Sequence, residues 1–130
     1  MADGTSTTSN DAMIRDFLGA WERRDTEYIV DRFTDDGVYH SIPLASIAGK
    51  PAIREFVARF ADVPPGRLVI HHQIASDDAV MNERTDYITI NGRPVTLPIC
   101  GVFEIENGRI KAWREYFDLG PVRAAYGEQL

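Results

Sequence analysis

Two Asn-Gly dipeptides, Asn91-Gly92 and Asn107-Gly108, constrain the second half of this chain more than any other feature. Each lies between runs of apolar and β-branched residues, and Asn-Gly in that setting is the strongest short-range signal for a β-hairpin. Together with a turn at Asp77-Asp78, they predict strands over residues 68–75, 79–90, 94–105 and 109–119. The second half is therefore predicted to form an antiparallel meander.

The first half has the apolar spacing of helices. One helix is predicted after the N-cap side chains at positions 9–11, a second over residues 26–33 and a third from Pro51, with a short edge strand over residues 38–42 between them. The residues expected on the buried helix faces are Ile14, Phe17, Leu18, Trp21, Tyr28, Ile29, Phe33, Ile53, Phe56, Val57 and Phe60. This order predicts an α+β fold, in which a curved antiparallel or mixed sheet wraps round a cavity and the three N-terminal helices cover its concave face.

Composition limits the class of protein. A length of 130 residues fits a single domain, predicted over residues 11–130 after a disordered N-terminal tail at residues 1–10. The net charge of −6 argues against nucleic acid or an anionic membrane as partner. A single cysteine excludes an internal disulfide, and the first ten residues lack the features of a signal peptide, so a cytoplasmic protein is expected.

Arg84 and Asp86 are the first candidate site residues. Alternate side chains of a strand share a face, so these two lie together, and a two-residue turn at Asn91-Gly92 sets Arg84 opposite Ile99 and Asp86 opposite Leu97. The ion pair is therefore expected among aliphatic side chains. Burying an ion pair costs several kcal/mol unless its geometry is good, so a buried pair indicates a site more than it indicates stability.

The face on which Glu115 lies cannot be decided from hairpin geometry. A two-residue turn at Asn107-Gly108 sends Glu115 to the face opposite Arg84, where it would be an ordinary solvent-facing carboxylate. A three-residue turn, or a bulge at Pro98 or Gly101, brings it to the same face.

Other reactive residue types have simpler interpretations. His71 and His72 are adjacent in a strand and point to opposite faces, so no metal site is predicted; His72 is expected to line the core. Cys100 is also predicted to be a core residue. An outer sheet face carrying Tyr87, Val102 and Tyr116 favours a homodimer.

Four segments carry a resemblance to a known family: NERTD (82–86), GVFEI (101–105), GRI (108–110) and WREYFD (113–118). They resemble the limonene-1,2-epoxide hydrolase family, within the NTF2-like, SnoaL-like superfamily. The similarity extends over about residues 11–119 and implies a cone-shaped NTF2-like barrel. It also implies a small apolar epoxide as substrate and no cofactor.

The resemblance assigns roles residue by residue. It implies that Asp86 is the general acid, that Glu115 is the general base, and that Arg84 bridges the two carboxylates. Tyr39 and Ser41 fall where the family places its other water ligands. Two positions differ from the family pattern, since Glu115 stands where the family has aspartate and Ser41 where it has asparagine.

The pocket wall is predicted to be formed by Ile88, Leu97, Ile99, Trp113 and Phe117. Because this fold serves several chemistries, two alternatives stay open at this point. One is an isomerase or epoxide cyclase, in which a carboxylate moves a proton or directs a hydroxyl of the substrate itself. The other is a non-catalytic module that binds a small molecule.

Overall fold

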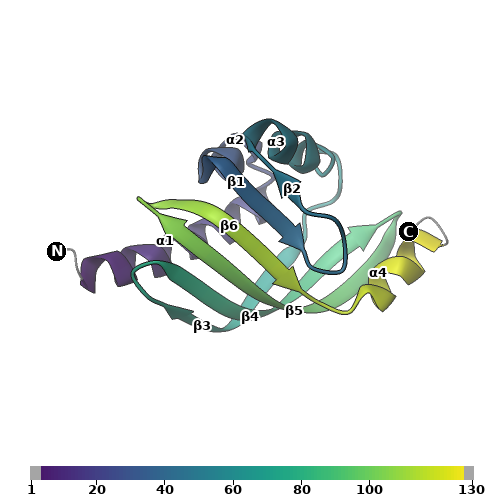
Figure 1. Cartoon of the computed structure of the whole chain (residues 1–130). Coiled ribbons are helices and arrows are strands. Elements are labelled where there is room, and N and C mark those ends of the chain that lie inside the picture. The colour runs from purple at the N-terminus through teal and green to yellow at the C-terminus, as the bar shows by residue number, and fades with distance from the viewer. Residues whose placement is uncertain (1–3, 128–130) are drawn as a thin grey trace.

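A single curved sheet of six strands organises the molecule, in the order β2-β1-β6-β5-β4-β3 (Figure 1). The structure, a computed structural model, describes residues 4–127. Strands β1 and β6 are parallel, and every other neighbouring pair is antiparallel. The elements in chain order are α1 (Gly4–Arg23), α2 (Thr26–Asp31), β1 (Phe33–Ser41), β2 (Ile47–Ala48), α3 (Lys50–Ala58), β3 (Arg67–Ala75), β4 (Ala79–Ile90), β5 (Arg93–Glu106), β6 (Arg109–Tyr116) and α4 (Leu119–Tyr126).

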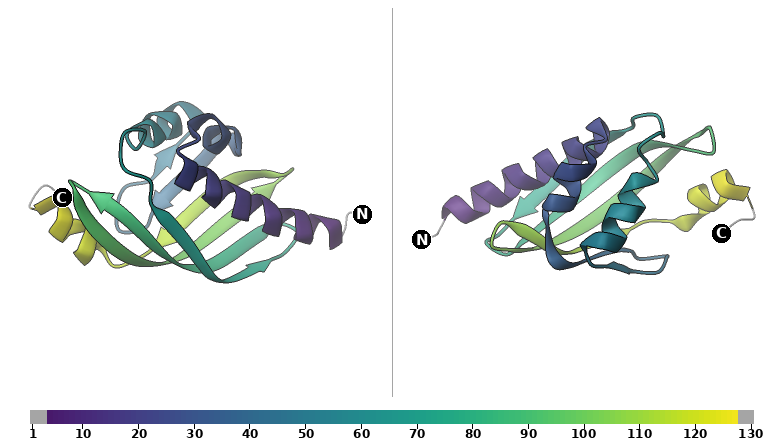
Figure 2. Two further views of the ribbon diagram at one scale, coloured as in Figure 1. Left: turned by 180° about the vertical axis from the view of Figure 1, so that it is seen from behind. Right: turned by 90° about the horizontal axis from the view of Figure 1, so that it is seen from above.

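The predicted α+β class is confirmed, with helices on the concave side of the sheet. Helix α1 runs across that side, and α2 and α3 lie over β1 (Figure 2). Helix α1 begins at Gly4 rather than at the predicted caps at positions 9–11. Asn10 is buried, and its side-chain amide donates to the carbonyls of Ser76 and Asp77 at 2.9 and 3.0 Å. The predicted tail is thus helical from Gly4, while residues 1–3 lie outside the described residues.

Aromatic side chains fill the space between α1 and the sheet. Phe17 of α1 packs edge-on against Phe33, Phe103 and Trp113, with ring centroids 5.7, 6.2 and 5.1 Å away. Trp113 in turn stacks on Phe103 on one side and on Tyr39 on the other, at 5.2 and 4.5 Å. Offset and edge-on pairs of this kind add to the hydrophobic gain from burial. This cluster fixes the position of Tyr39 relative to strand β6.

Both Asn-Gly hairpins have two-residue turns, so the three-residue turn considered at Asn107-Gly108 does not form. Residues 91 and 107 have φ of 52°, the left-handed conformation that Asn adopts readily. The register after Asn107-Gly108 then changes, because Ile105 pairs with Ile110 but Glu104 pairs with Ala112. Lys111 is the extra residue of a β-bulge, which replaces the bulge considered at Pro98 or Gly101. This one-residue shift brings Glu115 to the inner face, opposite Gly101.

A second bulge corrects the prediction for His72. Ile70 pairs with Arg84 but His72 pairs with Glu83, so His71 is an extra residue in β3. The shift turns His72 outward, where its side chain is 82% exposed, and turns Gln73 inward. Cys100, also predicted in the core, is exposed because it lies on the outer face of β5.

The sequence did not predict helix α4. Strand β6 ends at Tyr116 rather than at residue 119, and Asp118 caps the helix by accepting from the backbone N–H of Gly120 at 2.9 Å. Val122 and Ala125 of α4 pack on apolar residues of β4 and β5. The helix therefore covers the end of the sheet at which the hairpin Asn91-Gly92 lies (Figure 1).

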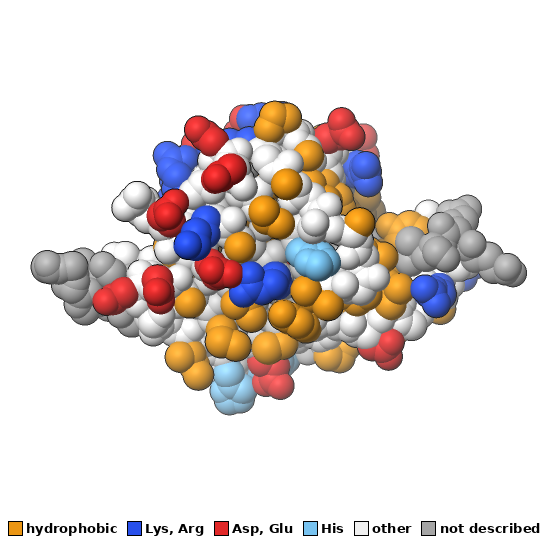
Figure 3. All heavy atoms as spheres, viewed as in Figure 1, with side chains coloured by type: hydrophobic (Ala, Val, Ile, Leu, Met, Phe, Trp, Pro, Cys, Tyr) orange, Lys and Arg blue, Asp and Glu red, His pale blue; other side chains and the backbone are white. Residues whose placement is uncertain are grey.

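Large apolar side chains are exposed on the outer face of the sheet, among them Ile74, Met81, Tyr87 and Tyr116. Figure 3 shows hydrophobic side chains gathered on this side of the molecule, over the strands. The homodimer suggested by Tyr87 and Tyr116 stays a prediction. Within residues 4–127, no helix combines the length and the apolar character needed to cross a membrane.

Candidate active site

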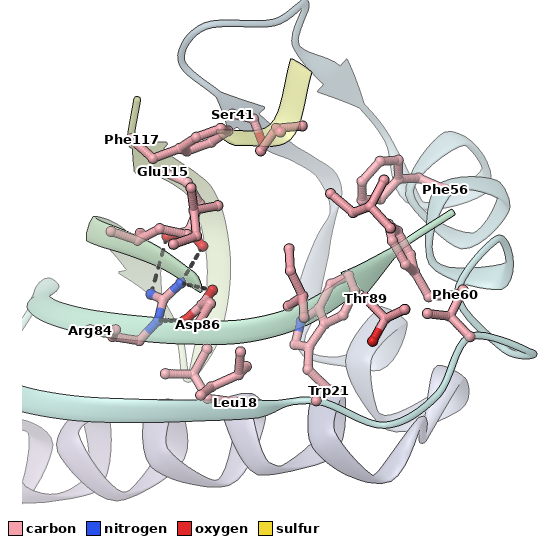
Figure 4. Close-up of a pocket in the computed structure, with 18 of the residues that line it drawn as sticks. Leu18, Trp21, Ser41, Phe56, Phe60, Arg84, Asp86, Thr89, Glu115 and Phe117 are labelled. Atoms are coloured by element: carbon pink, nitrogen blue, oxygen red, sulfur yellow. Dashed lines mark hydrogen bonds and ion pairs between the residues drawn. The ribbon is translucent and has the colours of Figure 1, made fainter. Parts of the chain in front are cut away.

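Arg84 lies between two carboxylates, at the buried end of a cavity (Figure 4). Its Nε and Nη2 donate to the two oxygens of Asp86, both at 3.0 Å. Its Nη2 and Nη1 donate to the two oxygens of Glu115, at 2.5 and 3.2 Å. The three residues are only 1%, 7% and 3% exposed, respectively. One cation thus holds two acids side by side, out of bulk water.

The guanidinium has a partner for each of its donors. Arginine has five N–H groups. Four of them serve Asp86 and Glu115, and the fifth, on Nη1, donates to the side-chain oxygen of Asn82 at 3.0 Å. Full pairing of a buried charge is what makes its burial tolerable.

The absence of a side chain at Gly101 makes room for this cluster. Gly101 faces Asn82 on β4 and Glu115 on β6. A Cβ atom built on Gly101 would lie 2.6 Å from Oε2 of Glu115 and 2.9 Å from Nη1 of Arg84. Contacts this short require the charged groups to move, so glycine is needed at this point of the central strand.

We therefore expect Gly101→Ala to lower kcat of a reaction that uses Arg84 and Glu115 by about 10²-fold, because displacing a reacting group by about 1 Å has an effect of that size. The matched control is Gly92→Ala, at an exposed turn with no heavy atom within 4 Å of the added Cβ. Because Gly92 has a φ of +74°, that control should cost some stability but leave kcat unchanged. Equal losses of kcat in Gly101→Ala and Gly92→Ala would contradict the view that Gly101 keeps Arg84 and Glu115 in position.

Burial and charge act on the site in opposite directions. Burial raises the pKa of Glu115 above its ordinary value of 4.5, the charge of Asp86 adds to the rise, and Arg84 opposes it. Burial disfavours the Arg84 cation, but Glu115 and Asp86 outweigh it and raise the pKa of Arg84. The arginine therefore keeps its charge, while Glu115 is a better proton acceptor than an ordinary glutamate.

Tyr39 and Ser41 lie beside the carboxylates on the neighbouring strand. In the parallel pair of β1 and β6, Tyr39 faces Trp113 and Ser41 faces Glu115. The Ser41 hydroxyl donates to the Tyr39 hydroxyl at 3.1 Å. Burial, with a contribution from the charge of Glu115, raises the pKa of Tyr39, so its phenol stays protonated. The two hydroxyls can both donate and accept hydrogen bonds next to Glu115.

The cavity above this cluster has a volume of about 330 Å³, within the range of small-molecule sites. All five residues predicted for its wall line it: Ile88, Leu97, Ile99, Trp113 and Phe117. Leu18, Trp21, Phe56 and Phe60 complete a largely apolar lining, and Figure 4 shows the last three on the side away from Arg84. The structure thus brings together every residue that the sequence singled out for catalysis or for the wall.

Two residues of the site, Asn82 and Gly101, had no predicted role. Asn82 shares a strand face with Arg84, so the alternation of β4 was the signal that could have found it. Gly101 was considered only as a bulge, although an isolated glycine in a strand also marks a close approach of other groups. Helix residues such as Leu18 and Phe56 were predicted simply as core.

Comparison with known proteins shows the family to which the chain belongs. Residues 8–125 match the family described as limonene-1,2-epoxide hydrolase catalytic domain. The chain is 34% identical over 103 residues to epoxide hydrolase EphG of Mycobacterium tuberculosis, covering 79% of this chain and 69% of that protein.

Solved structures of other proteins share the fold of this chain. A structure of an LEH-like epoxide hydrolase of M. tuberculosis superposes with a TM-score of 0.81 at 31% identity, over 92% of this chain and 90% of that one. An NTF2-like protein of Burkholderia pseudomallei has a TM-score of 0.81 at 22% identity, over 92% and 98% of the two chains, which is a likeness of fold alone. These matches support a hydrolase that acts on epoxides, and the chain belongs to the limonene-1,2-epoxide hydrolase family.

Proposed function

We propose that this protein is a cofactor-independent epoxide hydrolase that opens a small, largely apolar epoxide to a vicinal diol in one step. The observation that carries the proposal is the position of Arg84 between Asp86 and Glu115 at the buried end of an apolar cavity. A strained ether opens readily when its oxygen receives a proton while a nucleophile attacks the carbon behind it. The site offers one group for each task.

The proposed roles are those that the family resemblance implies, and they require a cycle that starts with Asp86 protonated and Glu115 ionised. Glu115 accepts a proton from a water held with Tyr39 and Ser41, and the water oxygen forms a bond to an epoxide carbon. The carbon–oxygen bond of the ring breaks, and Asp86 protonates the released oxygen. The diol leaves with Glu115 protonated and Asp86 ionised, so one proton returns between them before the next cycle.

The geometry is compatible with the two departures from the family pattern. Glutamate is one methylene longer than aspartate, yet both oxygens of Glu115 reach Arg84, at 2.5 and 3.2 Å. Ser41 is shorter than asparagine, but its hydroxyl is joined to that of Tyr39. The longer base and the shorter water ligand therefore shift the proposed water position without removing a partner from it.

Product analysis tests the proposal. The purified protein is incubated with limonene oxide, cyclohexene oxide and a varied epoxide panel, and the products are identified by chromatography and mass spectrometry. Formation of the vicinal diols above the uncatalysed rate is expected. Absence of turnover across the panel would contradict an epoxide hydrolase, and a rearranged or cyclised product would favour the isomerase or cyclase class.

The pH dependence follows from the state of Glu115. As general base it must be ionised, so kcat is lost as the pH falls through its pKa in the complex. Because burial raises that pKa above 4.5, the acidic half-point of the kcat profile should lie above 4.5. Rates for cyclohexene oxide between pH 4 and pH 9 measure it. A rate that stays constant down to pH 4 would contradict a base of this kind.

A further inference from the structure

A chain of side-chain amides links the buried guanidinium to helix α1. Asn82, itself only 3% exposed, accepts from Nη1 of Arg84 and donates to Oε1 of Gln73, both at 3.0 Å. Gln73 then donates to the carboxylate and the backbone carbonyl of Asp11, at 2.8 and 3.1 Å. The chain is present because the bulge at His71 turns Gln73 inward, opposite Asn82.

The two ends of the chain fix the direction of every amide within it. An ionised carboxylate only accepts hydrogen bonds, and a guanidinium only donates them. Gln73 must therefore present its NH₂ to Asp11 and its oxygen to Asn82. Asn82 must then present its NH₂ to Gln73 and its oxygen to Arg84. The hydrogen bond from Gln73 lowers the pKa of Asp11, which keeps that carboxylate ionised.

We propose that Asn82, oriented through Gln73 by Asp11, is a positioning residue that holds Arg84 in the plane in which it bridges both carboxylates. The inference deepens the proposed function and rests on it. Asn82 takes the one guanidinium N–H that neither carboxylate uses. It also shares a donor atom with Glu115, since Nη1 of Arg84 donates to Asn82 Oδ1 at 3.0 Å and to Glu115 Oε2 at 3.2 Å.

Asn82→Leu tests the positioning role directly. The variant keeps a side chain of similar size but offers no acceptor, so one buried N–H of Arg84 is left without a partner. We expect kcat for cyclohexene oxide to fall by about 10- to 100-fold, with KM changed less than about twofold, because the reacting groups are misplaced while the cavity wall is kept. Loss of thermal stability with an unchanged kcat would overturn the proposal.

Asn82→Asp is the conservative variant. It keeps the acceptor for Arg84, so the maximum of its kcat profile should recover most of what Asn82→Leu loses. It also adds a negative charge to a cluster in which Glu115 already faces Arg84 and Asp86 on β4, Tyr39 on β1 and Trp113 on β6. We expect the acidic half-point of the kcat profile to move up by about one pH unit. The control is Asn107→Asp, the same chemical change at an exposed turn, which should leave the profile in place.

A second readout needs no turnover and separates this inference from the proposed function. The carboxyl carbon of Glu115 is titrated by NMR in protein labelled with ¹³C-glutamate, its signal being assigned by its absence in Glu115→Gln. The midpoint should rise by about one pH unit in Asn82→Asp and stay unchanged in Asn107→Asp. An unchanged midpoint in Asn82→Asp would overturn the inference even if the protein hydrolyses epoxides. If the midpoint rose in a protein that does not hydrolyse epoxides, the positioning of Arg84 by Asn82 would be supported and the proposed epoxide hydrolase activity would be contradicted.

Gln73→Met keeps the test valid if residue 82 does not tolerate substitution. Gln73 is half-buried, and methionine preserves its length while removing all three hydrogen bonds of its amide. Asn82 is then free to turn its NH₂ towards Arg84, so kcat should fall several-fold at constant KM. An unchanged kcat in Gln73→Met would show that the orientation of Asn82 is not set from α1 and would overturn that part of the proposal.

Discussion

Replacing either carboxylate of the site by its amide, in Asp86→Asn or Glu115→Gln, is expected to lower kcat for epoxide opening by about 10²- to 10⁴-fold. General acid and general base catalysis have effects of this size. Each amide keeps the shape of the side chain and one of the two oxygens that accept from Arg84, so the cavity wall is kept and KM should change little. Steady-state rates with cyclohexene oxide provide the measurement.

The matched control for these variants is Glu104→Gln. Glu104 lies on β5, and its Oε2 accepts from Nη1 of Arg114 at 2.6 Å. Both side chains are half-exposed and lie outside the cavity. The same chemical change should leave kcat and KM as they are in the wild-type protein. If Glu115→Gln retained wild-type turnover, the general base would have to be another group, and the proposed roles would be wrong.

Arg84→Met is expected to have the largest effect on stability, about 3–5 kcal/mol at neutral pH, because it leaves two buried carboxylates without their cation. Without Arg84, nothing opposes the effect of burial on Glu115, so the pKa of this carboxyl in the folded protein lies above its value in the unfolded chain. Stability therefore falls as the pH rises and is regained as the pH is lowered towards 5. Urea unfolding of the variant at several pH values measures both effects.

Arg114→Met is the control for that experiment. It removes the partner of Glu104 from a half-exposed pair, and such pairs contribute about 0–1 kcal/mol. If Arg84→Met lost as little stability as Arg114→Met, the carboxylates next to Arg84 would be solvated rather than buried. A loss in Arg84→Met that does not depend on pH would contradict the same premise.

The sequence predicts much of the fold because its signals are local. The Asn91-Gly92 turn sets the register of β4 on β5, so the pairing of Arg84 with Ile99 and of Asp86 with Leu97 is confirmed. Helix α1 follows from its apolar spacing, with Ile14, Phe17 and Leu18 all buried. Helix α4 was missed because its cap, Asp118, follows directly on the strand pattern of β6.

The two β-bulges could not be predicted from the alternation of side chains along a strand. An extra residue at Lys111 or His71 costs little locally and leaves no clear mark in the sequence, yet it turns every later side chain of its strand to the other face. The first bulge decides that Glu115 meets Arg84. The second brings Gln73, rather than His72, to Asn82. Both bulges depend on tertiary packing, so hairpin geometry alone does not predict them.

A single turnover in ¹⁸O-labelled water tests the central claim most directly. The protein is mixed in excess over cyclohexene oxide, and the diol of the first turnover is analysed by mass spectrometry. Attack by a water bound at Glu115 predicts one ¹⁸O atom in that first diol and none in the carboxylates of Asp86 and Glu115. An unlabelled first diol, with ¹⁸O retained in a carboxylate of the protein, would show a covalent intermediate and contradict the account.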